Sequence, residues 1–76
     1  MIKINNTDNS LMITYVEQDV DYIIPKGVAI AIQSDDTDTV DIKMIATRKT
    51  VHSLDVKDVQ GYSTAKQLAE ALQEML

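Results

Sequence analysis

The 76-residue sequence contains no cysteine, which excludes disulfide bonds and thiolate metal sites as sources of stability. It has only two glycines, so no glycine-rich loop is present to cradle a phosphate group. No hydrophobic run approaches membrane-spanning length, and no basic segment precedes a long apolar run as in a signal peptide. We therefore expect a protein that neither enters a secretory pathway nor crosses a membrane.

Basic residues are scarce as well, with seven lysines and arginines against twelve acidic residues and a net charge of −5. Nucleic-acid binding requires clustered basic side chains that neutralise phosphates, and the only adjacent basic pair is Arg48 and Lys49. The composition therefore argues against a nucleic-acid partner. A chain of this length forms one small domain, which must gain its stability from a well-packed core or from association with other subunits.

Hydrophobic periodicity predicts an α+β fold that is mainly β, with residues 1–76 forming a single domain. We expect an antiparallel meander of five to six short strands, arranged as a sheet, a sandwich or a small barrel. The predicted strands are residues 1–5, 11–17, 21–24, 28–34, 39–46 and 50–56. From residue 64 onward the period changes to helical spacing, which predicts a helix over residues 64–76 that packs its apolar stripe on the sheet. Thr64 and Gln67 match a capping box at its start.

Residues 28–34 are apolar or small on both faces, which is typical of a central strand covered on both sides. The helix is expected to cover one face of the sheet. The side that carries Ala29 and Ala31 then needs another cover, either the sheet curling on itself or a second subunit. Ala29 and Ala31 are therefore candidate interaction residues.

The strand over residues 39–46 is expected to pair with this strand as a hairpin. With a four-residue loop, Ile32 would face the charged side chain of Asp41, and a shift of one residue turns a strand over. We therefore expect an irregular tip with an odd-numbered loop or a bulge, which pairs Ile32 with Val40 or Ile42.

The tip of this hairpin holds the densest acidic group, Asp35, Asp36, Asp38 and Asp41. Calcium sites need several oxygen ligands around a tight loop, but this segment lacks the glycine and the distal glutamate of an EF-hand. A solvated hairpin tip is the favoured interpretation, and a partner-facing acidic patch is the alternative. A second acidic group, Glu17, Asp19 and Asp21, is expected to consist of ordinary solvated side chains.

His52 is the only histidine, and the sequence supplies no cysteine or neighbouring carboxylate partner that would make it a base or a ligand. We expect it to be a surface or half-buried strand residue. Tyr15, Tyr22 and Tyr62 are the only aromatic residues, and the rim of the core is favoured over an interface for them. No serine lies in a nucleophile motif. We therefore expect no enzymatic activity, no metal and no cofactor.

The layout resembles small phage-encoded structural proteins in three segments. They are the Tyr-Ile-Ile-Pro-Lys-Gly segment at residues 22–27, the charged hairpin, and the Ser-x-Ala-x-x-Leu-Ala-x-x-Leu helix at residues 63–72. The resemblance implies a non-enzymatic virion or assembly role that is gained through subunit contacts, in the cytoplasm or in a virion. It carries over no functional residue.

These observations favour a structural or protein–protein interaction module, either a homo-oligomer or a part of a larger assembly. The candidate interaction residues are Ala29, Ala31, Asp35, Asp36, Asp38 and Asp41. The alternative is a small acidic inhibitor that occupies a basic groove of a nucleic-acid-binding host protein, because carboxylates can imitate a phosphate backbone.

Overall fold

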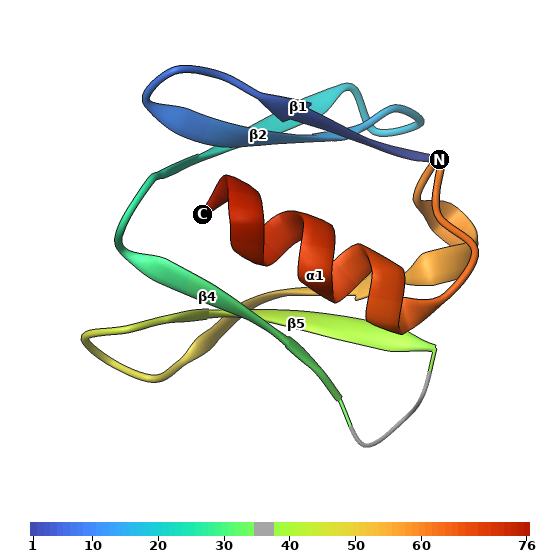
Figure 1. The fold of residues 1–76 in the computed structure, drawn as a ribbon. Helices are drawn as coiled ribbons and strands as arrows, with labels where there is room; N and C mark the ends of the chain where they lie inside the picture. The colour runs from blue at the N-terminus through green and yellow to red at the C-terminus, as the bar shows by residue number, and fades with distance from the viewer. Residues whose placement is uncertain (35–37) are drawn as a thin grey trace.

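The structure, a computed structural model, describes residues 1–34 and 38–76. Within these residues the chain forms six strands, one short 3-10 helix and one α-helix (Figure 1). The strands are β1 (Ile2–Asn6), β2 (Ser10–Tyr15), β3 (Val20–Pro25), β4 (Ala29–Gln33), β5 (Thr39–Met44) and β6 (Thr50–Asp55). They are followed by η1 (Val56–Asp58) and α1 (Ala65–Met75). The predicted α+β, mainly-β class with a C-terminal helix is confirmed.

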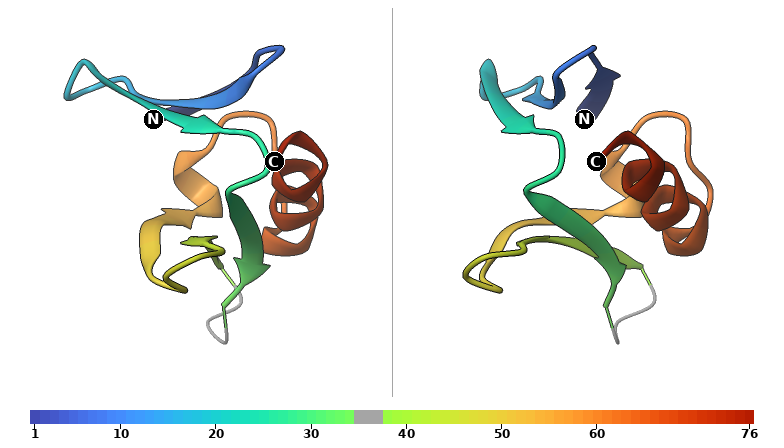
Figure 2. Two further views of the ribbon diagram at one scale, coloured as in Figure 1. Left: turned by 90° about the vertical axis from the view of Figure 1, so that its left-hand side faces the viewer. Right: turned by 60° about the vertical axis from the view of Figure 1, so that its left-hand side comes forward.

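The strands form two sheets, not one continuous meander. The first sheet has the order β1-β2-β3 and the second has the order β4-β5-β6, with antiparallel pairing throughout. Figure 1 shows the two sheets facing one another, and Figure 2 shows α1 lying along one side of them. Of the three predicted arrangements, this one is closest to the sandwich, with the helix completing its core.

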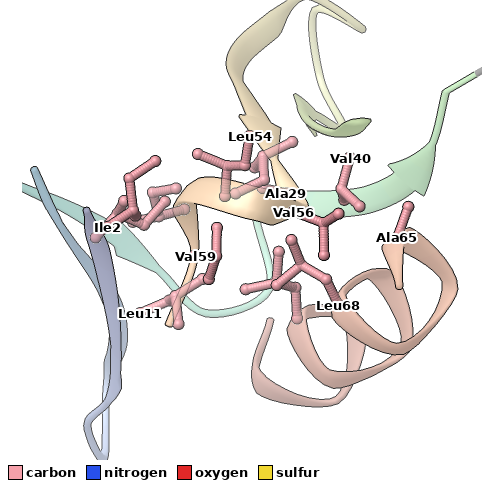
Figure 3. Packing of buried hydrophobic residues seen from close by; sticks show 13 residues of the cluster. Ile2, Leu11, Ala29, Val40, Leu54, Val56, Val59, Ala65 and Leu68 are labelled. Atoms are coloured by element: carbon pink, nitrogen blue, oxygen red, sulfur yellow. The ribbon is translucent and has the colours of Figure 1, made fainter. Parts of the chain in front are cut away.

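One hydrophobic core joins the inward faces of both sheets to α1 (Figure 3). Its buried members are Ile2, Leu11, Ile13, Ile24, Ala29, Val40, Ile42, Leu54, Val56, Val59, Ala65, Leu68 and Leu72. Alternate residues of β2 and β5 supply Leu11, Ile13, Val40 and Ile42, so each of these strands turns one face toward the core. Leu68 extends from α1 into this core, which is how the helix is held against the sheets.

The helix begins where its sequence predicts. The Thr64 hydroxyl oxygen accepts a hydrogen bond from the Gln67 N–H at 3.1 Å, and the Gln67 side-chain oxygen accepts one from the Ser63 N–H at 3.2 Å. The first bond satisfies a backbone donor that has no partner within the helix, as the predicted capping box requires, and the second ties the Gln67 side chain to the residue before the cap. At the other end, the Gly27 N–H donates to the Leu76 carbonyl at 2.8 Å, which ties the end of α1 to the link between the two sheets.

The strand boundaries shift from the predicted ones by one or two residues at most ends. For example, β2 ends at Tyr15 although the alternation continues to residue 17, because the chain reverses through Asp19, which has a φ of 55°. β6 ends at Asp55, whose carboxylate accepts a hydrogen bond from the Lys57 N–H at 3.1 Å and so starts η1. A chain reversal in the first case and a side-chain hydrogen bond in the second end the strand before the hydrophobic pattern does.

β4 is an edge strand of its sheet, and β5 is the central strand. The prediction that residues 28–34 form a central strand covered on both faces is therefore wrong. Alanines permit close approach of a helix, and α1 packs mainly against β4. The apolar residues on the other face of β4 are left partly exposed, with Ile32 at 41%.

The predicted register of the β4–β5 hairpin is also wrong. Ile32 lies opposite Asp41, and Ala31 lies opposite Ile42, so neither predicted partner faces Ile32. The reason is the helix: because the small side of β4 must face α1, Ala31 shares the inward face with Ile42, and Ile32 turns outward beside Asp41. The predicted irregular tip falls on residues 35–37, which lie outside the described residues.

Candidate functional site

The two alanines predicted to contact a partner are covered by the protein's own helix. Ala29 is only 2% exposed and belongs to the core, and Ala31 packs against that core. The Ala31 N–H donates to the Gln73 side-chain oxygen at 3.0 Å, so α1 also occupies part of the free edge of β4. This side was predicted to be covered either by the sheet curling on itself or by a second subunit, and both alternatives are wrong, because α1 provides the cover.

The acidic group at the hairpin tip is described in part. Asp35 and Asp36 lie outside the described residues. Asp38 is exposed, and its carbonyl accepts a hydrogen bond from the Val56 N–H at 2.9 Å. Asp41 lies on the outward face of β5, where its carboxylate accepts a hydrogen bond from the Ser53 hydroxyl at 2.7 Å. A partner-facing role for Asp38 and Asp41 stays a prediction.

The second acidic group, Glu17, Asp19 and Asp21, is exposed as predicted. The Glu17 carboxylate pairs with the N-terminal ammonium of Met1. The hydrogen bond from that ammonium holds the pKa of Glu17 below its ordinary value. Among residues 1–34 and 38–76, no group of three or more histidine or acidic side chains is arranged to hold a metal ion.

An apolar patch extends from the outward face of the second sheet to the end of β5 and the turn that follows it. Its residues, called here the outer patch, are Ile30, Ile32, Lys43, Met44, Ile45 and Arg48, and they line a hollow of about 450 Å³. Ile32 and Ile45 are 41% and 51% exposed, so large apolar side chains meet solvent there. Clusters of this kind, bordered by polar or charged residues, are typical of protein–protein contact sites.

A second group of side chains bridges the two sheets and consists of Tyr15 from β2, Tyr22 from β3 and His52 from β6. The ring centroids of Tyr15 and Tyr22 are 5.5 Å apart at 85°, and those of Tyr22 and His52 are 4.8 Å apart at 70°. Tyr15 also stacks on His52 with a centroid distance of 6.1 Å. Its hydroxyl lies 3.2 Å from the Nδ1 atom of His52. We call these three residues the aromatic cluster.

The surroundings of the aromatic cluster favour uncharged side chains. Burial lowers the pKa of His52, and burial together with the neighbouring Tyr22 raises the pKa of Tyr15. At neutral pH the Tyr15 phenol therefore keeps its proton, and His52 is a neutral imidazole that accepts hydrogen bonds at one ring nitrogen. The cluster offers aromatic surface and polar edges, and in the described residues the hydrogen-bond partner of the His52 ring is the Tyr15 hydroxyl.

The depressed pKa of His52 predicts a pH dependence of stability. Between the ordinary histidine pKa of about 6.5 and the lower folded value, the unfolded chain binds more protons than the folded protein. The contribution of neutral His52 to the free energy of unfolding is therefore complete above about pH 6.5, and it is lost as the pH falls through the pKa of His52 in the folded protein. Urea unfolding at pH 7.5 and pH 5.5 should show a larger loss of stability for the wild-type protein than for His52→Gln. An equal loss in both proteins would contradict this assignment.

The aromatic cluster is the feature that sequence reasoning missed. Tyr15 and His52 are separated by 37 positions and belong to different sheets, so no local pattern joins them. His52 is half-buried in a strand, and Tyr15 and Tyr62 pack at the rim of the core, both as predicted. Tyr22 is 45% exposed and lies farther from the core than predicted.

Comparison with protein-family models, with curated proteins and with solved structures finds no match to this chain. Its function is therefore inferred from its surfaces. In the part of the chain that the structure describes, no helix has the length and apolar character required to cross a membrane.

Proposed function

We propose that the chain is a non-enzymatic structural or protein–protein interaction module that acts through subunit contacts, as a component of a phage-type virion or a similar assembly. The observation that supports this role is the outer patch, where isoleucine side chains meet solvent on a sheet face that α1 leaves uncovered. The resemblance of residues 22–27 and 63–72 to phage structural proteins points the same way.

The outer patch suits contact between two copies of the chain. Burying an exposed aliphatic side chain contributes roughly 1.5–3 kcal/mol, and a two-fold contact buries the same residues on both copies. The patch is bordered by charges of both signs, with Asp41 opposite Ile32 and Lys43 opposite Ile30 across the β4–β5 ladder. A two-fold axis that passes between Asp41 and Lys43 would set Asp41 of one copy against Lys43 of the other, so that such a contact is complementary in charge.

Replacing Ile32 with lysine is expected to convert an oligomer into a monomer. The substitution places an ammonium group in the centre of the apolar contact, where it loses its hydration on association. The measurement is solution mass by light scattering at micromolar concentration, at low and at moderate salt.

The matched control is Ile23→Lys, because Ile23 is 68% exposed on the outward face of the first sheet. This variant should keep the mass of the wild-type protein. A wild-type protein that is monomeric at these concentrations contradicts self-assembly. An oligomer that survives Ile32→Lys and is lost in Ile23→Lys places the contact on the first sheet instead of the outer patch.

The alternative role, an acidic inhibitor of a nucleic-acid-binding protein, rests on carboxylates of which Asp35 and Asp36 lie outside the described residues. The described carboxylates Glu17, Asp55 and Asp58 line one hollow on the far side of β6 from β5. That arrangement supports a contact with a basic partner, whatever the partner's function is.

A further inference from the structure

β6 is an edge strand of the second sheet, and part of its backbone points away from its only strand neighbour in the described chain, β5. The Val56 N–H donates to the Asp38 carbonyl, which marks a hydrogen-bonded pair at one end of the β5–β6 ladder. Because such pairs alternate along an antiparallel ladder, Leu54 and His52 also direct their backbone groups toward β5. Ser53 and Asp55 therefore direct their N–H and carbonyl groups outward.

Two hollows adjoin this outward edge. The first has a volume of about 320 Å³ and is lined by the aromatic cluster together with Gln18, Val20 and Val51. The second has a volume of about 340 Å³ and includes Ser53 and Asp55 of β6 in its lining. The linings of the two hollows share Tyr15 and Gln18, so the hollows lie next to each other along β6, and together they are called here the β6 groove.

The two halves of the β6 groove differ in charge. The aromatic half is neutral, because burial raises the pKa of the Tyr15 phenol and lowers the pKa of His52, which favours the uncharged form of each side chain. The other half carries three carboxylates, those of Glu17, Asp55 and Asp58, and one cation, the ammonium of Met1, which pairs with Glu17. Its net charge is therefore negative, and it is complementary to a basic ligand.

We propose that the β6 groove binds an extended basic segment of a partner protein, which adds to the second sheet as a new strand beside β6. An exposed strand edge is a template for such addition, with backbone hydrogen bonds for affinity and side-chain pockets for specificity. A lysine or arginine of the segment lies over the acidic half, and an apolar side chain packs on the aromatic cluster. The inference rests on the proposed role in protein interaction, but it uses a surface separate from the outer patch.

The spacing within β6 defines the segment further. Val51 and His52 line the aromatic half, and Ser53 and Asp55 line the acidic half, so the two halves are roughly 7–10 Å apart along the strand. The basic residue and the apolar residue of the partner are therefore two or three positions apart.

The test uses two fluorescein-labelled pools of seven-residue peptides and fluorescence anisotropy. In both pools, random apolar residues alternate with random polar residues. The polar residues are lysine, arginine, serine and threonine in the basic pool, and aspartate, glutamate, serine and threonine in the acidic pool. The basic pool should bind about tenfold more tightly than the acidic pool, and its binding should weaken as salt is added. Equal binding of the two pools, or binding of neither, would overturn the proposal.

Ser53→Pro tests the strand addition itself. Proline is tolerated at an edge strand where the N–H points outward, and it removes that donor from the groove. Affinity for the basic pool should fall about tenfold in this variant, since at least one backbone hydrogen bond is lost and the proline ring obstructs the new strand. The matched control is Ile23→Pro at the outward edge of β3, which should bind the pool as the wild-type protein does.

Circular dichroism shows whether Ser53→Pro is folded, and a second variant tests the same groove if it is not. If Ser53→Pro fails to fold, Asp58→Lys reports on the same groove, and it should lower affinity for the basic pool while leaving the fold intact. Ile32→Lys should bind the basic pool normally, so failure of the self-assembly proposal and failure of this one are distinguishable. If Ser53→Pro bound the basic pool as the wild-type protein does but no longer formed oligomers, the inference would be overturned. The β6 edge would then be a contact between copies of the chain.

Discussion

Replacing Leu68 with alanine is expected to lower the free energy of unfolding by about 3 kcal/mol and to leave a large fraction of the protein unfolded at 25 °C. Leu68 is fully buried and extends from α1 into the core shared by both sheets (Figure 3). Domains of this size have a stability of only about 3–5 kcal/mol, so one cavity in this position removes most of it.

The measurement is urea unfolding followed by circular dichroism at 222 nm and at 215 nm. Because an isolated helix of this length is unstable in water, the helical and strand signals should disappear in one transition, at a lower urea concentration than in the wild-type protein. The control is Glu70→Ala on the exposed side of α1, which should change stability by no more than about 0.5 kcal/mol. An unchanged midpoint in Leu68→Ala would show that α1 is not docked as described.

The helix and its docking residues are the part of the fold that the sequence predicts best. Ala65, Leu68 and Leu72 recur at helical spacing, and all three are buried. Thr64 and Gln67 form the predicted hydrogen bond at the N-terminus. Each of these features depends on residues within one or two turns of each other, so the local pattern contains the information.

The register of β4 was not predictable in the same way. A strand with one apolar face and one polar face has a single favourable orientation, but β4 carries alanines on one face and isoleucines on the other. Both orientations satisfy a period of two, and the choice depends on where α1 packs. Since α1 lies more than thirty positions away in the sequence, the deciding contact is a tertiary one.

The candidate surfaces follow from that same choice. Once Ala29 and Ala31 face the helix, Ile30 and Ile32 must face outward and create the outer patch. The sequence also predicts that one apolar face of this strand is left uncovered by the helix, but that face is expected to be the one that carries Ala29 and Ala31. The aromatic cluster depends on the packing of the first sheet against the second, which no spacing within a strand encodes.

Replacing Ala29 with lysine is expected to lower the free energy of unfolding by about 4 kcal/mol, enough to unfold most of the protein. Ala29 is 2% exposed beneath α1, so the new side chain must either bury its ammonium group or push the helix away from β4. The same change at Ile32, three residues along the strand and on its opposite face, should alter the stability of the folded chain by only about 0.5 kcal/mol.

Urea unfolding of the two variants, each at a concentration where the wild-type protein is monomeric, measures the difference. A stable Ala29→Lys protein together with an unfolded Ile32→Lys protein would mean that β4 presents its isoleucines to the helix, as a one-residue shift of register requires. The outer patch would then be lined by alanines, and the proposed contact between copies would lose its apolar centre. The stability of these two variants therefore tests the register on which the proposed interface depends, before any partner is known.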